Sequence, residues 1–480
     1  MRLRFTVITT IKTTLLLTAL TAMTGCSAIQ KVADTNLGTG YTAHELCSRL
    51  FISGEDEQVI LERVVKPKVF PLQYVWNLDI DKQQKVVSVS APFFRGLNQA
   101  TAVYRPHIGC TLLSEKTTEE LRTDTLKPVA IRQIEITTAK PFQLNSEHNQ
   151  LTPYFQRFYQ EDSDDPAEQI HTFTTAALLN GELIHEQYAQ GHHGEMKMLS
   201  WSMAKTITAL LIGILIDEGK LSLEQAIANT SDDKGQIQLQ HVLQMSSGLE
   251  WREGYKGSSD VSYMLYEHGN TANYVEGRPQ QYPPGKHFQY STGDTQLLAE
   301  VIRQTLPHTS NRTLDSDQQG LYDFYQQRLF KPLGINAVVE HDESGGFIGG
   351  ARMFMTTHDW LKIGQLILQQ GQWTVQGESQ QLVSPEWIHW ISQPSPAKDY
   401  YGGQLWLANM ETDIAGIPDD AVFLRGHLGQ IVAVIPSRQL VLVRLGAQGN
   451  KVTPSAFIER FLQDLAELIS AIDVRHSANN

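Results

Sequence analysis

A serine and a lysine three positions apart, Ser202 and Lys205, are the residues best placed to do chemistry in this chain of 480 residues. In a helix, residues at this spacing share one face over a single turn, so the amine would lie near the serine oxygen. Burial disfavours the ammonium form of lysine and leaves a neutral amine that can accept the hydroxyl proton. The pair therefore predicts a serine nucleophile with a lysine as its base.

The residues after Ser202 predict the helix that this geometry requires. Apolar side chains recur at spacings of three and four, and they form a stripe of Met203, Ile207, Leu210, Leu211, Ile214 and Leu215. A serine is favoured at a helix start, and Gly219 stands where the helix should end. Two further Ser-x-x-Lys strings begin at Ser231 and Ser395, but neither opens an apolar helix. Only the first string has the context that catalysis needs.

Length, charge and composition limit the classes of protein that fit. The chain is long enough for two or three domains. Its formal net charge of −13 does not indicate a nucleic-acid-binding surface. His192 and His193 lack further residues at metal-ligand spacing, and the glycine-rich stretch 345–350 lacks the lysine of a phosphate-binding loop. We therefore expect no metal, no cofactor and no nucleic-acid partner.

The first 25 residues are predicted to be a secretory signal peptide. Basic residues precede an apolar run at 15–22, and the string MTGC at 23–26 follows. This string resembles a bacterial lipobox, which implies cleavage before Cys26, acylation of that cysteine and a lipid anchor in a membrane. Ser27 resembles the outer-membrane sorting signal of Gram-negative lipoproteins, so we expect a cell-envelope protein on the outer membrane, facing the periplasm. The alternative is a plain signal peptide or membrane anchor with an incidental cysteine.

The two remaining cysteines, Cys47 and Cys110, form an even pair in an oxidising compartment. We predict a disulfide between them, closing a loop of roughly sixty residues and stabilising the fold by a few kcal/mol. The alternative is two separate buried thiols.

The polar, acidic stretch 147–169 marks a predicted boundary between an N-terminal module, 26–150, and a larger domain, 151–480. The module shows strand-like runs at 85–94 and 101–113, separated by turns with proline and glycine. These features predict a small, mostly β module of unknown role.

The larger domain opens with a predicted β-hairpin and ends with strands and a helix. Two strand-like runs flank Asn180-Gly181, the dipeptide most typical of a two-residue hairpin turn. Mainly helical segments follow, then strands at 430–436 and 440–445 and a helix from Pro454. Strands at both ends of the domain with helices between them predict an α/β fold, an antiparallel sheet flanked by helices.

Three strings in this domain resemble motifs of the serine β-lactamase and penicillin-binding-protein superfamily. They are Ser202-Met203-Ala204-Lys205, Tyr290-Ser291-Thr292 and His427-Leu428-Gly429. The similarity extends over about residues 170–473 and is greatest to the class C-like branch, which includes D-aminopeptidases, carboxylesterases and 6-aminohexanoate-dimer hydrolases. It implies a β-lactamase/transpeptidase-like fold with a helical subdomain beside the sheet.

The resemblance also implies a catalytic role for each matching residue. Ser202 would attack an amide or ester carbonyl of a small-molecule or peptide substrate to form an acyl-enzyme, with Lys205 as its base. Tyr290 would carry a proton to the leaving group and later help to activate water. The backbone N–H groups of Ser202 and Gln430 would form the oxyanion hole.

Three further residues would line the substrate pocket: Thr292, His427 and Gly429. Thr292 stands where the superfamily usually has asparagine, and His427 stands where it often has lysine. Because the asparagine amide and the lysine charge help to hold a β-lactam, their loss disfavours efficient penicillin hydrolysis. An esterase or amidase for small or linear substrates is favoured instead.

Several alternatives remain open at this point. The chain could be a D-Ala-D-Ala carboxypeptidase, a β-lactamase, or a non-catalytic envelope protein that keeps a penicillin-binding fold. Ser202 could be a helix cap without a catalytic role, Tyr290 could be a half-buried aromatic residue, and His427 could be structural. An ordinary α/β-hydrolase is disfavoured because the sequence lacks a Gly-x-Ser-x-Gly elbow.

Overall fold

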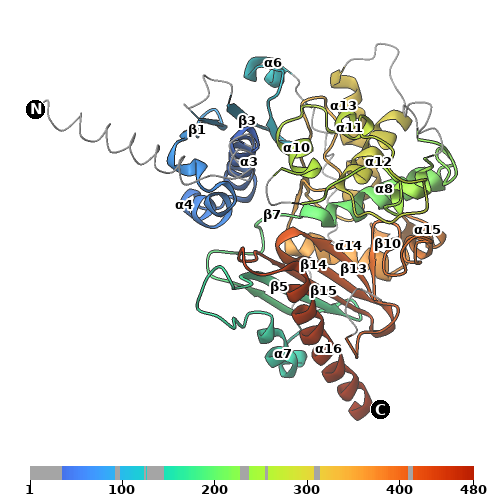
Figure 1. Cartoon of the computed structure of the whole chain (residues 1–480). Coiled ribbons are helices and arrows are strands. Elements are labelled where there is room, and N and C mark those ends of the chain that lie inside the picture. The colour runs from blue at the N-terminus through green and yellow to red at the C-terminus, as the bar shows by residue number, and fades with distance from the viewer. Residues whose placement is uncertain are drawn as a thin grey trace, which may run out of the picture.

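The computed structural model describes residues 35–91, 98–123, 126, 145–227, 237–254, 258–306, 314–408 and 414–479. The predicted signal peptide, Cys26 and the string at Ser231 lie outside these residues. In Figure 1 the N-terminal module lies beside a helical part, and a large sheet with the C-terminal helix lies below them. None of the described helices is both long and apolar enough to cross a membrane.

The N-terminal module consists of one antiparallel sheet and the helices around it. The strands, in spatial order, are β1 (Asn77–Asp81), β2 (Val86–Ser90), β3 (Gln99–Arg105) and β4 (Gly109–Leu112). The helical segments are α3 (Thr35–Ser48), a π-helix (Arg49–Ser53), α4 (Glu57–Val59), a second π-helix (Ile60–Val65), α5 (Lys66–Val69), a 3-10 turn (Leu72–Tyr74) and α6 (Thr118–Thr123).

Strand β2 lies in the first predicted strand-like run, and the second run divides into β3 and β4. Strand β1 was not predicted, and the module holds more helix than the sequence indicates. Helix α3 carries two glycines and three threonines, residue types with low helix propensity, and shows no single apolar stripe. Almost all of its residues from Leu37 onward are buried, and they pack on β2, β3 and β4. Tertiary packing therefore overrides propensity here, and the module is mixed α/β rather than mostly β.

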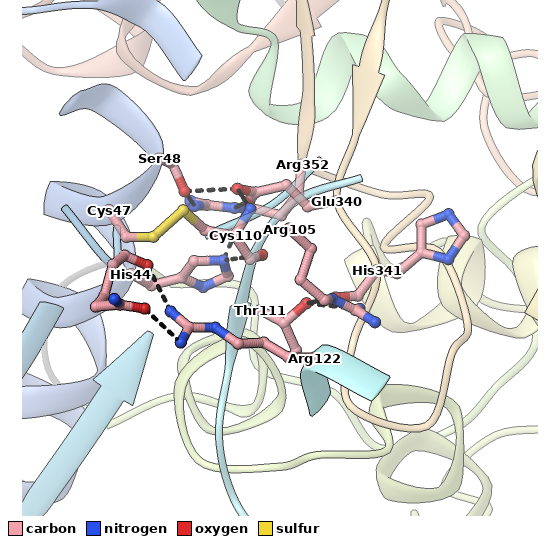
Figure 2. Close-up of a disulfide and its surroundings, with 11 residues drawn as sticks. His44, Cys47, Ser48, Arg105, Cys110, Thr111, Arg122, Glu340, His341 and Arg352 are labelled. Atoms are coloured by element: carbon pink, nitrogen blue, oxygen red, sulfur yellow. Dashed lines mark hydrogen bonds and ion pairs between the residues drawn. A yellow bond between two sulfur atoms is a disulfide. The ribbon is translucent and has the colours of Figure 1, made fainter. Parts of the chain in front are cut away.

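A disulfide joins Cys47 on α3 to Cys110 on β4, and both residues are fully buried (Figure 2). The two residues are 63 positions apart and their Cα atoms are separated by 6.1 Å. The predicted pairing is present, and the alternative of two separate thiols is wrong. The bond fixes the helix to an edge strand of the module's sheet.

A six-stranded antiparallel sheet forms the centre of the second domain. Its strands, in spatial order, are β12 (Trp406–Leu407), β13 (Val422–Gly426), β14 (Gln430–Ile435), β15 (Leu440–Gly446), β5 (Thr172–Leu179) and β6 (Glu182–Tyr188). The predicted hairpin is confirmed, because β5 and β6 pair across Asn180-Gly181. Strand β5 also pairs with β15, so the two ends of the domain meet in the middle of the sheet.

Helices cover both faces of this sheet. Ala177 and Leu179 of β5 belong to the apolar cluster of α16 (Pro454–Asn479), together with Phe457, Phe461, Leu465 and Leu468 of that helix. Ala176 and Leu178 face the opposite way, into the cluster of α8 (Ala204–Asp217) and α14 (Thr357–Leu368). The alternation along β5 thus divides the core into two layers.

The remaining elements lie around α8 and at the rim of the sheet. A small sheet contains β7 (Met198–Leu199), β9 (Met353–Met355) and β8 (Val338–Val339). The helical subdomain contains α9 (Leu239–Leu243), α10 (Asp260–Tyr266), α11 (Thr271–Glu276), α12 (Thr292–Thr305), α13 (Leu314–Tyr325) and a π-helix (Gln326–Phe330). Elsewhere are α7 (Thr152–Arg157), β10 (Gln372–Val375), β11 (Glu378–Gln381), α15 (Pro385–Ile391) and 3-10 turns at Ser146–Leu151, Trp201–Met203, His427–Gly429 and Pro436–Arg438. The predicted antiparallel sheet flanked by helices, with a helical subdomain, is confirmed.

The stretch predicted as a domain boundary folds onto the second domain. The Asn145 N–H already donates to the Leu183 carbonyl on β6, at 2.8 Å. Within the acidic part, Asp165 pairs with Lys451 at 2.6 Å, and further ion pairs reach helix α16. These residues are thus held by the C-terminal part of the chain.

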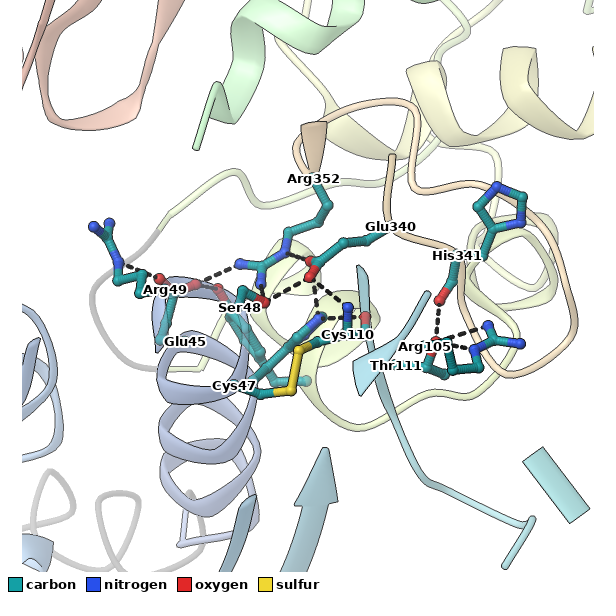
Figure 3. Close-up of polar contacts among 12 residues, drawn as sticks. Glu45, Cys47, Ser48, Arg49, Arg105, Cys110, Thr111, Glu340, His341 and Arg352 are labelled. Carbon is teal, nitrogen blue, oxygen red and sulfur yellow. Dashed lines mark hydrogen bonds and ion pairs between the residues drawn. A yellow bond between two sulfur atoms is a disulfide. The ribbon is translucent and has the colours of Figure 1, made fainter. Parts of the chain in front are cut away.

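Buried charged side chains join the N-terminal module to the second domain (Figure 3). Arg352, next to β9, donates to Glu340 Oε2 at 2.6 Å, to Ser48 Oγ at 2.8 Å and to Glu45. Glu340 also accepts from Ser48 Oγ at 2.6 Å and from the Cys110 N–H at 2.9 Å. These four side chains are fully buried, so the two parts share one polar core.

Candidate active site

Ser202 and Lys205 lie together at the start of α8, as predicted. Ser202 sits in the 3-10 turn Trp201–Met203, and Lys205 is the second residue of the helix that follows. The amine Nζ lies 3.1 Å from Ser202 Oγ. Both side chains are buried, Lys205 almost completely. The predicted stripe packs into the core, and the helix ends at Asp217, two residues before Gly219.

The turn that carries Ser202 has an unusual backbone. Trp201, directly before the serine, has a φ of +48°, which is in the left-handed region that bulky residues rarely adopt. Neither the turn nor α8 is capped by a side-chain hydrogen bond, so Ser202 does not act as a helix cap. Such strain, of about 1–3 kcal/mol, persists where the surrounding structure imposes it, and it is concentrated at functional sites.

The amine of Lys205 has two further partners, both from distant parts of the chain. It lies 2.8 Å from Thr292 Oγ1 at the start of α12 and 2.8 Å from the Gly350 carbonyl oxygen. A Cβ at Gly350 would lie 2.7 Å from Thr292 Cγ2, so only glycine lets this loop approach so closely. The amine is therefore held by three oxygen atoms.

Glu253 completes the polar network behind Lys205. Its carboxylate accepts from Thr292 Oγ1, from the Thr292 N–H at 2.8 Å and from Trp251 Nε1 at 2.6 Å. Since the Thr292 proton is donated to Glu253, the hydroxyl oxygen is free to accept from the lysine. The threonine thus links the amine to a carboxylate without direct contact between the two charges.

Burial lowers the pKa of Lys205 to about 8, although the charges of Glu253 and Asp294 act in the opposite direction. Asp294 is itself buried, and desolvation raises its pKa to about 7. Its Oδ1 accepts from Ser247 Oγ at 2.8 Å, whereas Oδ2 has no hydrogen-bond partner among the described residues. The neutral amine is therefore far more populated near neutral pH than that of an ordinary lysine, which favours activation of the nucleophile.

Tyr290 lies against the same amine. Its ring centroid is 5.1 Å from Lys205 Nζ, and the ring packs against Tyr401 and Trp406 with centroids 5.9 and 5.2 Å away. Desolvation raises the pKa of the phenol well above its usual value, and Glu253 raises it further. The phenol therefore keeps its proton at neutral pH and can donate it.

Gln430 begins β14 next to the turn of Ser202. A Cβ on Gly426, which faces Gln430 across the strand pair, would lie 2.3 Å from the Ser200 carbonyl oxygen. The side chain of Gln430 is held inside the domain by Gly446, through Nε2 at 2.5 Å and Oε1 at 3.0 Å. Its backbone N–H is the group that the oxyanion-hole prediction uses, and that role stays a prediction.

The three predicted pocket residues lie in different places. His427 is partly exposed and packs edge-on against Trp201, with centroids 5.1 Å apart. Thr292 is fully buried and belongs to the lysine network rather than to a pocket wall. Gly429 is buried at the end of the 3-10 turn that precedes β14, and its carbonyl oxygen accepts from Arg444 Nη1 at 2.7 Å. Of the three, His427 lines a cavity of about 640 Å³.

The pKa of His427 is lowered well below its usual value by desolvation and by the nearby Lys68 ammonium. The ring is therefore neutral at pH 7. His192, which invited a metal interpretation, stacks on Phe173 at 4.2 Å. The part of the chain that the structure describes contains no group of three or more His, Cys, Asp or Glu residues placed to hold a metal ion.

The third Ser-x-x-Lys string forms no such site. Ser395 and Lys398 lie in a turn closed by a backbone hydrogen bond of 3.0 Å, and the lysine side chain lies over the Tyr400 ring at 4.2 Å. Residues that sequence reasoning missed are Glu253, Asp294 and Gly350. The glycine-rich stretch 345–350 was the one signal that could have located Gly350, as a loop able to approach a buried side chain closely.

Several known proteins are similar to the second domain of this chain. A family model described as Beta-lactamase matches residues 155–466. A solved structure named as a 6-aminohexanoate-dimer hydrolase from Bacillus anthracis has a TM-score of 0.51 at 20% identity and covers 63% of this chain and 80% of that one. A structure named as a beta-lactamase from Bacteroides dorei has a TM-score of 0.51 at 15% identity and covers 68% and 100%.

EstCE1, described as a hydrolase with promiscuous acyltransferase activity, has a TM-score of 0.51 at 14% identity and covers 67% of this chain and 99% of its own. No curated protein sequence matches the chain. At these identities the solved structures establish the fold alone. The family match begins at residue 155, after the N-terminal module.

Proposed function

Because this chain belongs to the beta-lactamase family of hydrolases, we propose that it cleaves an amide or ester bond through an acyl-enzyme on Ser202. The observation that carries the proposal is the buried amine of Lys205, 3.1 Å from Ser202 Oγ and with a pKa of about 8. A serine hydroxyl is a weak nucleophile until a neighbouring base accepts its proton. Here that base lies within hydrogen-bond distance before any substrate arrives.

The three oxygen atoms around the amine accept from the ammonium form, and they are also compatible with a neutral lysine that acts as the base. A neutral amine has two protons and one lone pair. The protons satisfy Thr292 Oγ1 and the Gly350 carbonyl oxygen, which are both acceptors at 2.8 Å. The lone pair is then left for the proton of Ser202. The network therefore orients the free amine for proton transfer in the required direction.

The steps of the proposed reaction follow from these groups. Ser202 Oγ forms a bond to the carbonyl carbon while its proton passes to Lys205 Nζ. Tyr290, whose pKa is raised, donates its proton to the departing alcohol or amine and regains one from Lys205. Water then attacks the acyl-enzyme, releases the acid and restores the serine. The N–H groups of Ser202 and Gln430 would stabilise the oxyanion in both steps.

An ester or amide other than a β-lactam is the substrate class we favour. Thr292 has no side-chain amide to offer a substrate, and its hydroxyl is already hydrogen-bonded with Lys205 and Glu253. His427 is neutral at pH 7 and carries no charge for a carboxylate. The alternatives are D-Ala-D-Ala carboxypeptidase activity and β-lactamase activity, and a substrate screen distinguishes them from esterase or amidase activity.

We also propose that the mature protein is exported and lipid-anchored through Cys26 in the cell envelope. The Cys47–Cys110 disulfide supports export, since such bonds persist in oxidising compartments. Mass spectrometry of the protein from its native membranes tests this. An N-terminal diacylglyceryl-cysteine at position 26 is expected, and an unmodified N-terminus would contradict it.

Labelling with a fluorophosphonate probe, followed by a hydrolysis screen, tests the catalytic proposal. We expect covalent labelling of the wild-type protein and turnover of short esters or D-amino-acid amides in preference to nitrocefin. Both should be lost in Ser202→Ala and retained in Ser395→Ala, the serine of the unused Ser-x-x-Lys string. Labelling that survives Ser202→Ala, or the absence of both labelling and turnover in the wild type, would favour a non-catalytic envelope protein.

A further inference from the structure

Two exposed aromatic side chains lie next to each other on the N-terminal module. Phe70 directly follows α5 and is 62% exposed, and Tyr74 ends the 3-10 turn Leu72–Tyr74 and is 74% exposed. Their ring centroids are 6.0 Å apart, in an edge-on arrangement. Among the described residues, the other large apolar side chains that are exposed are Val59 and Val474. Single exposed apolar residues are ordinary, whereas two adjacent aromatic rings form a candidate contact surface.

The packing of the turn holds both rings outward. Val69, directly before Phe70, is buried in the apolar core of the module, and Leu72 packs against the same core. A Cβ on Gly38 of α3 would lie 2.5 Å from Leu72 Cδ1 and 3.9 Å from Val69 Cγ1, so the turn lies tightly against that helix. Because these inward positions are filled, the rings of Phe70 and Tyr74 stay on a well-packed support at the surface.

The contact with α3 also places this turn close to the proposed lipid anchor. Gly38 lies in the first turn of α3, which begins at Thr35, and Cys26 is nine residues before Thr35. An extended chain spans at most about 3.3–3.6 Å per residue, so the start of α3 lies within about 30 Å of the anchored cysteine. A compact chain of 480 residues is roughly 60 Å across. The tether therefore keeps this part of the module near the membrane.

Aromatic rings suit the boundary between lipid and water. They gather at the level of the lipid headgroups, where the ring of a tyrosine contacts acyl chains and its hydroxyl contacts water. The formal net charge of −13 opposes a general attraction of the protein to an anionic lipid surface. A membrane contact at this turn would therefore depend on the two rings, and added salt should affect it little.

We infer that the turn 70–74 is a membrane-docking surface: the rings of Phe70 and Tyr74 enter the lipid interface and hold the anchored protein in one orientation. The occupant of this surface is the lipid bilayer that carries the anchor. The inference rests on the proposed lipid anchor at Cys26 and is independent of the proposed hydrolase reaction.

Docking at this turn would also orient the active-site region. Pro67, three residues before Phe70, lines the same cavity of about 640 Å³ as His427. His427 in turn packs against Trp201, the residue next to Ser202. The cavity would therefore stay at a fixed place relative to the membrane.

Photo-crosslinking of the acylated protein in vesicles tests the inference. The vesicles contain phosphatidylethanolamine and phosphatidylglycerol with a small share of a phospholipid that bears a diazirine on its acyl chain. After irradiation, peptide mapping locates the lipid adducts. The peptide that contains Phe70 and Tyr74 should carry several-fold more adduct than the peptides of α16, whose C-terminal end lies far from the module (Figure 1). Added salt should not change this ratio.

The double variant Phe70→Ser/Tyr74→Ser should reduce adduct formation at this peptide by about tenfold, because serine does not partition into lipid. Phe70→Trp/Tyr74→Trp should retain the adducts, since tryptophan also favours the interface. Val474→Ser, which changes an exposed apolar residue near the end of α16, is the matched control and should leave them unchanged. The melting temperature and ester hydrolysis in solution should stay as in the wild type, because the altered side chains are exposed.

The outcomes separate this inference from the proposed anchor. If the acylated protein floats with the vesicles, yet the turn carries no more adduct than α16 or the serine variant equals the wild type, the docking surface is overturned and the anchor stands. If the protein is not acylated and does not float with the vesicles, both proposals fail together. A dimer that the serine variant dissociates, without lipid adducts at the turn, would assign the rings to a contact between two copies and would also overturn the inference.

Discussion

Two buried charged clusters, one around Lys205 and one around Arg352, both contact the segment 350–352, and they behave in opposite ways. The Gly350 carbonyl accepts from Lys205, and Arg352 pairs with Glu45 and Glu340. In the first cluster burial lowers the pKa of the lysine to about 8, because the nearest partners are neutral oxygen atoms. In the second, Arg352 and its two carboxylates stay ionised, and the pKa of Glu340 falls to about 2.

The difference shows that the partners of a buried charge, more than burial itself, decide its protonation. Lys205 meets its nearest carboxylate only through Thr292, so desolvation dominates. Arg352 touches Glu340 directly at 2.6 Å, so attraction offsets desolvation for both groups. One cluster is suited to proton transfer, and the other to holding two parts of the chain together.

Replacing each cation by methionine should give opposite results, and the largest effect belongs to catalysis. Lys205→Met should lower kcat/KM by about 10²–10⁴-fold, since the general base is lost. The melting temperature should change little, because the loss of the donor to the Gly350 carbonyl is offset by replacing a poorly solvated amine with an apolar chain of similar length. Ester hydrolysis and thermal unfolding measure both effects. A stable variant with unchanged kcat/KM would show that lysine is not the base.

Arg352→Met should instead destabilise the fold by about 3–5 kcal/mol, because Glu45 and Glu340 remain buried without their counter-charge. Urea unfolding measures the change. Arg438→Met is the control, since that arginine forms a partly exposed pair with Asp473 and should cost no more than about 1 kcal/mol. Equal losses for the two variants would remove the distinction between the clusters.

Acid should weaken the second cluster in a defined window. The pKa of Glu340 is lower in the folded state than its usual value of 4.5, so its stabilising effect is present above pH 4.5 and is lost as the pH falls toward 2. The loss should amount to a few kcal/mol. Unfolding free energies at pH 6 and pH 3 measure it. Glu340→Gln should start less stable and show a smaller acid-dependent loss; an identical slope would argue against this carboxylate as the cause.

The smallest expected effect concerns the tuning of Lys205 by Glu253. Because the Glu253 charge raises the pKa of the lysine, Glu253→Gln should move the midpoint of the pH–rate profile to lower pH. The control is Glu250→Gln, which changes a nearby, partly exposed carboxylate paired with Arg278. A midpoint that moves upward, or moves equally in both variants, would mean that Glu253 does not act on the amine.

The parts of the site that sequence could predict depend on local geometry. Ser202 and Lys205 are one helical turn apart, so their proximity follows from the helix alone. The same holds in the fold for the β5–β6 hairpin, whose turn needs only Asn180-Gly181. Gly350 and Thr292, in contrast, are 145 and 87 positions from Lys205, and only the folded chain brings them to the amine. No local pattern encodes such contacts.

The N-terminal module illustrates the same limit. Its disulfide followed from counting cysteines, whereas α3 carries residues of low helix propensity and is stabilised by burial against the module's sheet. Its contact with the second domain depends on charges far apart in the chain, such as Glu45 and Arg352. The sequence around Glu45 or around Arg352 therefore does not show that the two residues pair, so the position of the module could not be predicted.

The pH dependence of fluorophosphonate labelling at Ser202 tests most directly whether a neutral Lys205 activates the serine. The amine is protonated below its pKa and free above it, so the labelling rate should rise with pH with a midpoint near 8. Peptide mapping should place the adduct on Ser202, and Lys205→Met should abolish the rise. A rate that stays flat from about pH 6 to 10, across the window in which lysine deprotonates, or an adduct on another residue would contradict this mechanism.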